Sequence, residues 1–189
     1  MTVEREIFIN AFPPSMTTEV NSFLGKLNWT TPHKSTECFQ INFDGQILNI
    51  PYRIYYDEPS QQNLTDNEIF LLDCIFTRHH DGYIREKRLR NILKTDNYLA
   101  TPFIAQLLGE YVLEILTTIN DNLSQTLLDN LIRLTTDNPV FFNTTEQRVQ
   151  SYWNCYYKWM TPKKADYVGF QILKAIKNRK QELKLTNIQ

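Results

Sequence analysis

The sequence contains few glycines and no long hydrophobic run. Its 189 residues include 5 glycines against 10 tyrosines and 11 phenylalanines, which predicts few tight turns and many packed aromatic rings. No stretch approaches the roughly 18 consecutive apolar residues that a membrane-spanning helix requires. The opening residues MTVEREIFIN lack the hydrophobic region of a signal peptide. We therefore expect a protein that has no membrane partner.

The sequence is also poor in cysteine and in catalytic signatures. Cys38, Cys74 and Cys155 are odd in number, lie far apart in the chain and form no CxxC pair. This is typical of reduced thiols, so we expect a cytoplasmic protein. The chain has no Gly-rich phosphate loop, no GxSxG and no HExxH. We therefore expect no catalytic residues, no cofactor and no enzymatic activity.

The net charge of −1 conceals an uneven distribution of charged residues. Residues 78–94 carry six basic and two acidic side chains, and residues 158–184 carry eight basic and two acidic ones, so the rest of the chain sums to −11. Such asymmetry predicts separate basic and acidic faces, which attract a charged partner. The pattern leaves open whether this partner is a protein or a nucleic acid.

The clearest strand signal is the stretch CFQINFDGQILNIPYRIYY, which begins at Cys38. Asp44-Gly45 suits a two-residue type I′ turn, because both positions of that turn need a positive φ. Pairing outward from the turn sets Ile41 opposite Leu48 and places four apolar side chains on one face: Phe39, Ile41, Leu48 and Ile50. The pattern predicts a hairpin over 39–50 with one buried side, packed against helices.

From residue 64 onward the signals are helical. Thr65 and Glu68 form a capping box at the start of a first helix, and Gly82 separates it from a second. Thr101-Pro102 provides an N-cap and an N1 proline for a long helix, whose apolar residues keep helical spacing over 103–119. Further helices are expected at about 122–135, from Thr144 or Thr145, and, as a basic helix, from near Ala165.

These elements predict a mainly α fold, in which an N-terminal β-hairpin packs on a short HEAT-like antiparallel helical array. Residues 1–60 form a small α+β segment that contains the hairpin, and residues 61–189 form a helical region. We expect the two to fold as one cooperative unit.

The second predicted helix resembles the second helix of a HEAT repeat. In that repeat an Asp lies in the turn and a hydrophobic–Arg pair begins the helix, as Asp81, Ile84 and Arg85 do here. The helices at 64–78 and 103–119 would begin successive pairs, with a spacing of about 37 residues that is close to the lower bound for such repeats. Arg88 departs from the pattern, which usually has a small residue at that place.

Four stretches together resemble an uncharacterised family of bacterial proteins: IPYRIYYDEP, TRHHDGYIREKRL, PFIAQLLGEYVLEI and TEQRVQSYWNCYY. The resemblance extends from Trp29 to Phe170, and its motifs are specific in combination. It implies a bacterial, cytoplasmic protein that folds as one unit. No catalytic residue follows from the resemblance, because no activity is established for that family.

The stretch TRHHDGYIREKRLRNIL contains two of the three histidines. A metal or acid–base site at His79, His80 and Asp81 is one interpretation. However, a metal needs three or four converging ligands, adjacent histidines project in different directions, and His33 is isolated. The favoured interpretation is a joint, in which the histidines end one helix and Asp81 caps the next.

The stretch SYWNCYYKWM places five aromatic side chains in two helical turns, so no single helix face can bury them all. We expect Tyr152, Trp153 and Tyr156 in the core and Tyr157 or Trp159 at the surface, where such rings anchor interfaces or stack on bases. Together with nearby cations, they give the candidate binding residues: Lys87, Arg88, Arg90, Tyr157, Trp159, Lys163 and Lys164.

Glu110 and Glu114 lie four residues apart, on one face of the predicted long helix. Two such carboxylates can act as an acid–base pair or bind a hard cation. The favoured interpretation is a polar stripe that pairs with Arg85 or Arg88. The glutamates and the His79–Asp81 cluster support only a third-ranked hypothesis, an enzyme with a His/Asp/Glu site.

The favoured function is binding of a macromolecule, most directly a protein. Small bacterial proteins without catalytic motifs act as adaptors, or as immunity or antitoxin factors that block a partner, and this step rests on analogy. The alternative is a nucleic-acid-associated protein that uses its basic helices. The pI of 6.3 and the absence of a nucleic-acid-binding motif weigh against that alternative. The oligomeric state is left open.

Overall fold

The computed structural model describes residues 3–27, 34–35 and 37–186. Most of these residues are helical, which confirms the predicted mainly α class. The chain forms two compact units, here called unit 1 (Met1–Lys94) and unit 2 (Thr95–Gln189). The isolated His33, and Trp29 at the start of the family resemblance, lie outside the described residues.

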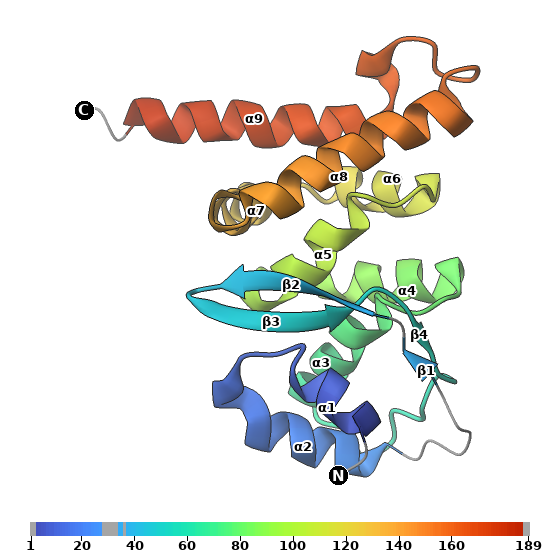
Figure 1. The fold of residues 1–189 in the computed structure, drawn as a ribbon, viewed down its shortest axis with the longest axis vertical. Coiled ribbons are helices and arrows are strands. Elements are labelled where there is room, and N and C mark those ends of the chain that lie inside the picture. Colours follow the sequence, from blue (N-terminus) through green and yellow to red (C-terminus); the bar gives the residue numbers. More distant parts are fainter. Residues whose placement is uncertain (1–2, 28–33, 36, 187–189) are drawn as a thin grey trace. The chain divides into compact units, whose positions relative to one another are not determined.

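Unit 1 combines two pairs of helices with short antiparallel strands (Figure 1). Its helices are α1 (Val3–Ile9), the 3₁₀ turn η1 (Pro14–Met16), α2 (Thr17–Lys26), α3 (Asp66–Phe76) and α4 (Gly82–Ile92). Its strands are β1 (Lys34–Ser35), β2 (Cys38–Phe43), β3 (Gln46–Pro51) and β4 (Ile54–Tyr55), with β2 paired to β3 and β1 paired to β4.

The predicted hairpin is confirmed as β2–β3, with Ile41 opposite Leu48 and Phe39 opposite Ile50. Asp44 and Gly45 have φ values of 52° and 81°, as the turn requires. All four paired apolar side chains are buried. Strand β3 packs against α1, the helix that precedes the hairpin in the sequence.

Helices α3 and α4 pack against each other as consecutive neighbours. The predicted capping box is confirmed at the start of α3, where Thr65 and Glu68 exchange hydrogen bonds. Glu68 also pairs with Lys26 of α2 at 2.7 Å, and this ion pair lowers the pKa of the glutamate. Glu68 thereby stabilises both the start of α3 and its contact with α2. The HEAT-like repeat stays a prediction.

Unit 2 is helical throughout its regular structure (Figure 1). Its elements are the 3₁₀ turn η2 (Tyr98–Ala100), α5 (Thr101–Leu107), α6 (Leu113–Asp121), α7 (Gln125–Asp137), α8 (Pro139–Tyr152), the π-helical turn η3 (Trp153–Tyr157), the 3₁₀ turn η4 (Lys164–Asp166) and α9 (Val168–Thr186). Helix α9 packs against α6, α7 and α8, so its buried residues Ile172, Leu173 and Ile176 complete the core of this unit.

The predicted long helix over 103–119 is wrong, because the chain breaks it into α5 and α6. At Gly109 an added Cβ would lie 3.1 Å from Cδ of Arg148, so α8 approaches the backbone closely there. The hydroxyl of Tyr157 donates to the carbonyl of Tyr111, inside the break. Because the apolar spacing continues across the break, periodicity could not reveal it.

Two other helix starts differ from expectation. Thr101 is the first residue of α5 and not its N-cap, because η2 runs directly into the helix and Asn97 caps η2 instead. Helix α8 begins at Pro139, before the predicted start at Thr144 or Thr145.

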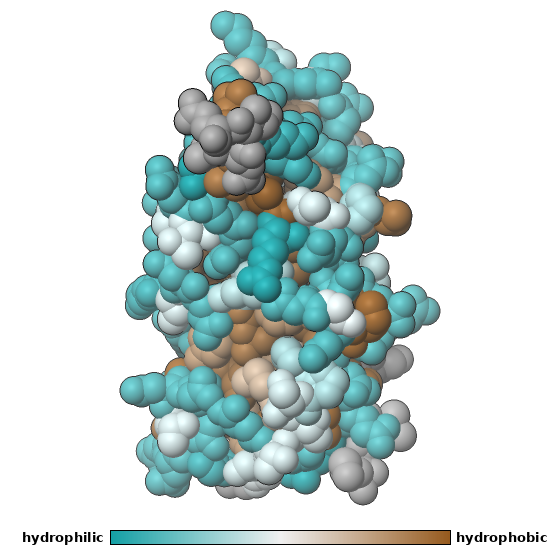
Figure 2. Space-filling model, turned by 90° about the vertical axis from the view of Figure 1, so that its left-hand side faces the viewer, coloured by the Kyte–Doolittle hydropathy of each residue, from teal (hydrophilic) through white to brown (hydrophobic). Residues whose placement is uncertain are grey.

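Figure 2 shows one face of the molecule, on which hydrophilic side chains predominate and hydrophobic ones emerge in groups between them.

Candidate functional site

The two histidines of TRHHDGYIREKRLRNIL lie at the joint between α3 and α4. His79 is 3% exposed, and its Nε2 lies 2.7 Å from the carbonyl oxygen of Tyr56. Its Nδ1 accepts a hydrogen bond of 3.0 Å from the backbone N–H of Asp81, so Nε2 carries the proton of a neutral ring. Burial lowers the pKa of His79. Both ring nitrogens of His79 therefore form hydrogen bonds that stabilise the joint between α3 and α4.

The neighbours of His79 have separate roles. His80 is exposed and its ring stacks on Tyr55 at 5.0 Å, while Asp81 caps α4 by accepting from the N–H of Tyr83 at 2.8 Å. Within the described residues, no group of three or more His, Cys, Asp or Glu side chains is placed to hold a metal ion. The chemistry of this stretch is that of a structural joint.

Arg85 closes the same joint from α4. Its Nη1 donates to the carbonyl oxygens of His79 and His80 at 2.9 and 2.8 Å. Two backbone carbonyls therefore hold Arg85 at this joint. Strand β4 also binds this joint through its backbone. The N–H of Ile54 donates to the carbonyl of Arg78, and the carbonyl of Ile54 accepts from the N–H of His80.

Arg88 requires a correction, because it is 2% exposed and lies inside unit 1. Its Nη1 donates to Asp73 at 2.7 Å, and its Nη2 to Glu58 at 2.6 Å. Burial raises the pKa of Glu58, but the hydrogen bonds from Arg88 and Lys87 outweigh that effect and lower it overall. A helical arginine is usually solvated, but this one forms a buried ion-pair network and cannot face a partner.

The other two candidate cations of α4 are exposed, and both have carboxylate partners. Lys87 pairs with Glu58 at 3.2 Å, and Arg90 pairs with Glu86 one turn away at 2.6 Å. Exposed pairs of this kind contribute little to stability and exchange partners readily. Lys87 and Arg90 therefore behave as the solvated charges of an ordinary helix face.

The aromatic stretch of unit 2 forms the π-helical turn η3. The N–H of Lys158 donates to the carbonyl of Trp153 at 2.8 Å, which is the i→i+5 bond that defines such a turn. Trp153 is buried, and its Nε1 donates to the carbonyl of Thr161 at 2.9 Å. This bond anchors the segment that follows the turn. π-Helical turns are frequent at functional sites because they re-aim the side chains around them.

Tyr157 is half-buried and is held at both ends. Its ring stacks on Tyr167 at 5.3 Å, and its hydroxyl donates to the carbonyl of Tyr111. Burial raises the pKa of Tyr157, and the negative charge of Glu114 raises it further. Tyr157 is therefore a structural tether and not the open anchor that the sequence suggested.

The exposed rings are different from those expected. Tyr156 is 55% exposed, so its predicted place in the core is wrong, whereas Trp159 is 77% exposed, as expected. Tyr111, Tyr152 and Tyr156 contact one another with ring centroids about 6 Å apart, and we call them the tyrosine cluster. The sequence does not reveal that Tyr111 is exposed, because its position fits the apolar spacing of the predicted long helix.

Two lysines lie over the ring of the buried Trp153. The ammonium groups of Lys158 and Lys164 lie 5.7 and 5.4 Å from the ring centroid of Trp153, within cation–π range. Lys164 also donates to Oε1 of Gln150 at 2.6 Å, and Lys163 is exposed beside it. Four of the predicted binding residues thus lie in one segment of unit 2, namely Tyr157, Trp159, Lys163 and Lys164.

The predicted pair of carboxylates is not formed as expected. Glu110 lies in the break between α5 and α6 and is buried, while Glu114 is in the first turn of α6. The two residues therefore do not share one helix face. The geometry that an acid–base pair on a continuous helix would have is absent at these two residues.

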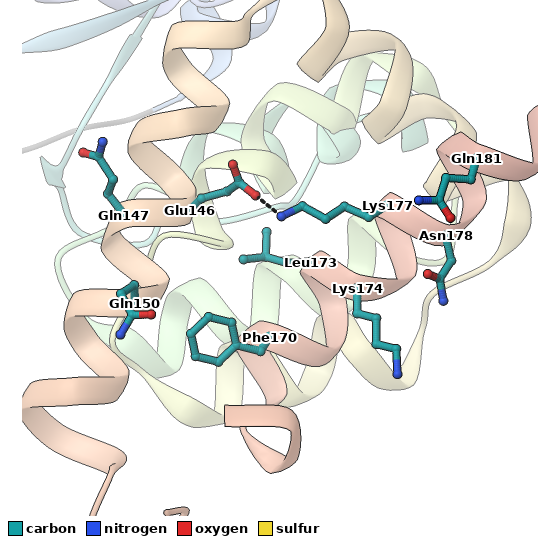
Figure 3. A pocket seen from close by; sticks show the side chains of 9 residues that line it. All are labelled: Glu146, Gln147, Gln150, Phe170, Leu173, Lys174, Lys177, Asn178 and Gln181. Carbon is teal, nitrogen blue, oxygen red and sulfur yellow. Dashed lines mark ion pairs between the residues drawn. The ribbon is translucent and has the colours of Figure 1, made fainter. Parts of the chain in front are cut away.

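A groove between α8 and α9 was missed by the sequence analysis. It has a volume of about 620 Å³ and is lined by amide, lysine and apolar side chains, including Gln147, Gln150, Phe170 and Lys174 (Figure 3). Its residues come from two helices, and on each helix alone they look like an ordinary polar face. Only the pairing of α8 with α9 brings them together.

Comparison of the chain with models of protein families, with curated proteins and with solved structures gives no match. The resemblance to an uncharacterised bacterial family therefore stays a prediction. No described helix combines the length and the apolar character that crossing a bilayer requires.

Proposed function

We propose that this chain is a macromolecular binding protein, a bacterial adaptor or an immunity- or antitoxin-type factor, which acts by binding a protein partner. The observation that carries the proposal is the aromatic surface of unit 2, where the exposed Tyr156, Trp159 and Met160 lie on and directly after the π-helical turn. Exposed large aromatic side chains with a polar rim are the usual anchors of protein interfaces.

The surface is also rigid, which favours tight binding. Trp153 fixes the segment after the turn through Thr161, and Tyr157 fixes the turn to Tyr111. Less conformational freedom is therefore lost when a partner binds. Lys158, Lys163 and Lys164 lie in the same segment of the chain as the exposed rings and favour a partner whose complementary surface is acidic.

The three cysteines support a cytoplasmic setting, because Cys38, Cys74 and Cys155 are all free thiols. Cytosolic proteins keep their thiols reduced. Cys74 is buried, and its burial raises the pKa of the thiol, so the reactive thiolate form of Cys74 is disfavoured.

Site-specific photo-crosslinking in the native cell tests the proposal. A photoreactive phenylalanine at Trp159 should crosslink to a defined protein, which mass spectrometry identifies. The same amino acid at Val140, which is 79% exposed at the opposite end of α8, is the matched control. A partner trapped from position 159 and not from position 140 supports the proposal, while equal trapping from both, or none from either, overturns it.

Nucleic-acid binding is the second candidate, favoured by the eight basic and two acidic residues of 158–184. Duplex and single-stranded oligonucleotides should then bind with an affinity that falls steeply with salt. Charge reversal at Lys163 and Lys164 tests the electrostatic part. Arg88 is left out of that set, because its reversal would disrupt the interior of unit 1.

A further inference from the structure

The groove between α8 and α9 has a distinctive mixture of chemistry. Its apolar floor is formed by Phe170 and Leu173. Amide side chains border it from both helices, Gln147 and Gln150 from α8 and Asn178 and Gln181 from α9 (Figure 3). Amides donate and accept hydrogen bonds at once, so they can satisfy the N–H and C=O groups of an extended peptide. A hydrophobic floor with amide walls fits a peptide backbone with an apolar side chain.

The charges of the groove define what kind of peptide fits. Lys177 points to Glu146 and pairs with it at 2.6 Å, whereas Lys174 points away from that pair (Figure 3). The ammonium of Lys174 has no ion-pair partner among the described residues. Over its whole length, α9 carries five basic residues and one acidic residue. The groove therefore offers an unneutralised cation beside its apolar floor.

Lys164 connects the groove to the π-helical turn. Lys164 donates to Gln150, which lines the groove, and its ammonium lies 5.6 Å from the ring centroid of Phe170. The same ammonium faces Trp153 at the π-helical turn. One lysine thus contacts both the lining of the groove and the π-helical turn within unit 2.

We propose that the α8–α9 groove binds an extended acidic segment of the partner protein, with an apolar side chain against Phe170 and Leu173 and a carboxylate on Lys174. This proposal rests on the proposed function and names the chemistry of the partner. A nucleic acid fits less well, because Lys177 is already paired with Glu146, which leaves Lys174 as the unpaired cation among the described residues that line the groove. Recognition of a phosphate backbone also needs a row of cations, each on a phosphate.

Selection from a random dodecapeptide display library on the full chain tests this proposal. The recovered peptides should be rich in Asp and Glu and carry an apolar residue. In fluorescence polarisation, Lys174→Glu should weaken a selected peptide at least tenfold, and Gln150→Ala several-fold. Lys184→Glu reverses the same charge on the same helix outside the groove and should change affinity less than twofold.

Other outcomes overturn the proposal. These are a library that yields no binder, peptides without acidic enrichment, or peptides that bind Lys174→Glu as well as the unmodified chain. Displacement by a single-stranded oligonucleotide at lower concentration than free peptide would assign the groove to nucleic acid. Concentration-dependent dimerisation that Lys174→Glu abolishes would assign it to a second copy of the chain.

Failure here is distinct from failure of the proposed function. If position 159 crosslinks to a partner while the library yields no acidic peptide, the binding function stands and the groove proposal falls. If the library yields acidic peptides and position 159 crosslinks to nothing, the groove binds such peptides and the aromatic surface at Trp159 is not the interface with a partner. Lys174 is exposed, so its reversal should leave the fold intact, which circular dichroism verifies.

Discussion

Arg88 and Asp73 form a buried ion pair between α4 and α3, with Nη1 of the arginine 2.7 Å from Oδ1 of the aspartate. Both side chains are almost fully buried. Burial raises the pKa of Asp73, against the opposing effect of Arg88, so the charged carboxylate depends on its partner. A buried charge that loses its partner is far more costly than an exposed one, because water cannot replace the lost contact.

We expect Arg88→Met to lower the free energy of unfolding by about 3–5 kcal/mol, because it leaves Asp73 buried and unpaired. Arg90→Met is the matched control, since Arg90 lies on the same helix and forms an exposed pair with Glu86. That variant should cost at most about 1 kcal/mol. Urea denaturation measures both values.

The double variant Arg88→Met/Asp73→Leu tests the mechanism. It should recover much of the stability that Arg88→Met loses, because no unpaired charge then remains at position 73. Equal losses for Arg88→Met and Arg90→Met would contradict the assignment of Arg88 to the interior.

Local signals were predictable from the sequence, because their partners lie close together in the chain. The capping box of Thr65 and Glu68, the cap at Asp81 and the Asp44-Gly45 turn each involve residues within three positions of one another. Their chemistry depends on the backbone at those few residues alone. All three were found.

Features that depend on distant contacts could not be predicted. The sequence gives no sign that Arg88 is buried, because the carboxylates that pair with it, Glu58 and Asp73, lie 30 and 15 residues away in the chain. The break between α5 and α6 is contacted by Arg148 and Tyr157, which are remote from Gly109 in the chain. The residues that line the groove resemble ordinary polar helix faces in the sequence, because the groove forms only where α8 packs against α9.

His79 should make stability depend on pH. Burial lowers its pKa below the usual value of about 6.5, so the folded state binds fewer protons than the unfolded state as the pH falls through that value. By linkage, the stabilisation is complete above about pH 6.5 and is lost as the pH falls further, because protonation of Nδ1 removes the hydrogen bond from Asp81.

Chemical denaturation between pH 5 and pH 7.5 measures this effect. His79→Gln should flatten the dependence, because its amide supplies a donor without titrating in this range. His80→Gln is the control, since His80 is exposed beside it and should leave the slope in place. A slope that survives His79→Gln and disappears with His80→Gln would contradict the assignment.

Trp153→Phe should loosen the segment that presents Trp159 and Met160. The phenyl ring keeps the packing against Phe170, but the hydrogen bond from Nε1 to Thr161 is lost. Stability should fall by about 1 kcal/mol, the usual net contribution of a hydrogen bond. Hydrogen exchange of amides 158–161 should accelerate, while exchange within α7 should not. Unchanged exchange after the turn would show that Trp153 does not hold this segment.

Gly169, in the first turn of α9, has no room for a Cβ atom. A Cβ at this position would lie 2.8 Å from Cε1 of Tyr167 and 2.9 Å from Cγ1 of Val149, and both of those side chains are buried. Alanine normally stabilises a helix relative to glycine, by about 1 kcal/mol. Here the steric overlap should outweigh that gain, because neither neighbour has room to move.

We therefore expect Gly169→Ala to lower the free energy of unfolding by about 1–3 kcal/mol, as overpacking of a core does. Gly25→Ala is the matched control, because Gly25 is also helical and its nearest neighbouring atom lies 3.8 Å from the added Cβ. That variant should be neutral or stabilising. In a Val149→Ala background the cost of Gly169→Ala should shrink, since one of the two overlaps is gone. If Gly169→Ala stabilises the protein as much as Gly25→Ala does, then α8 and α9 do not approach closely at this point.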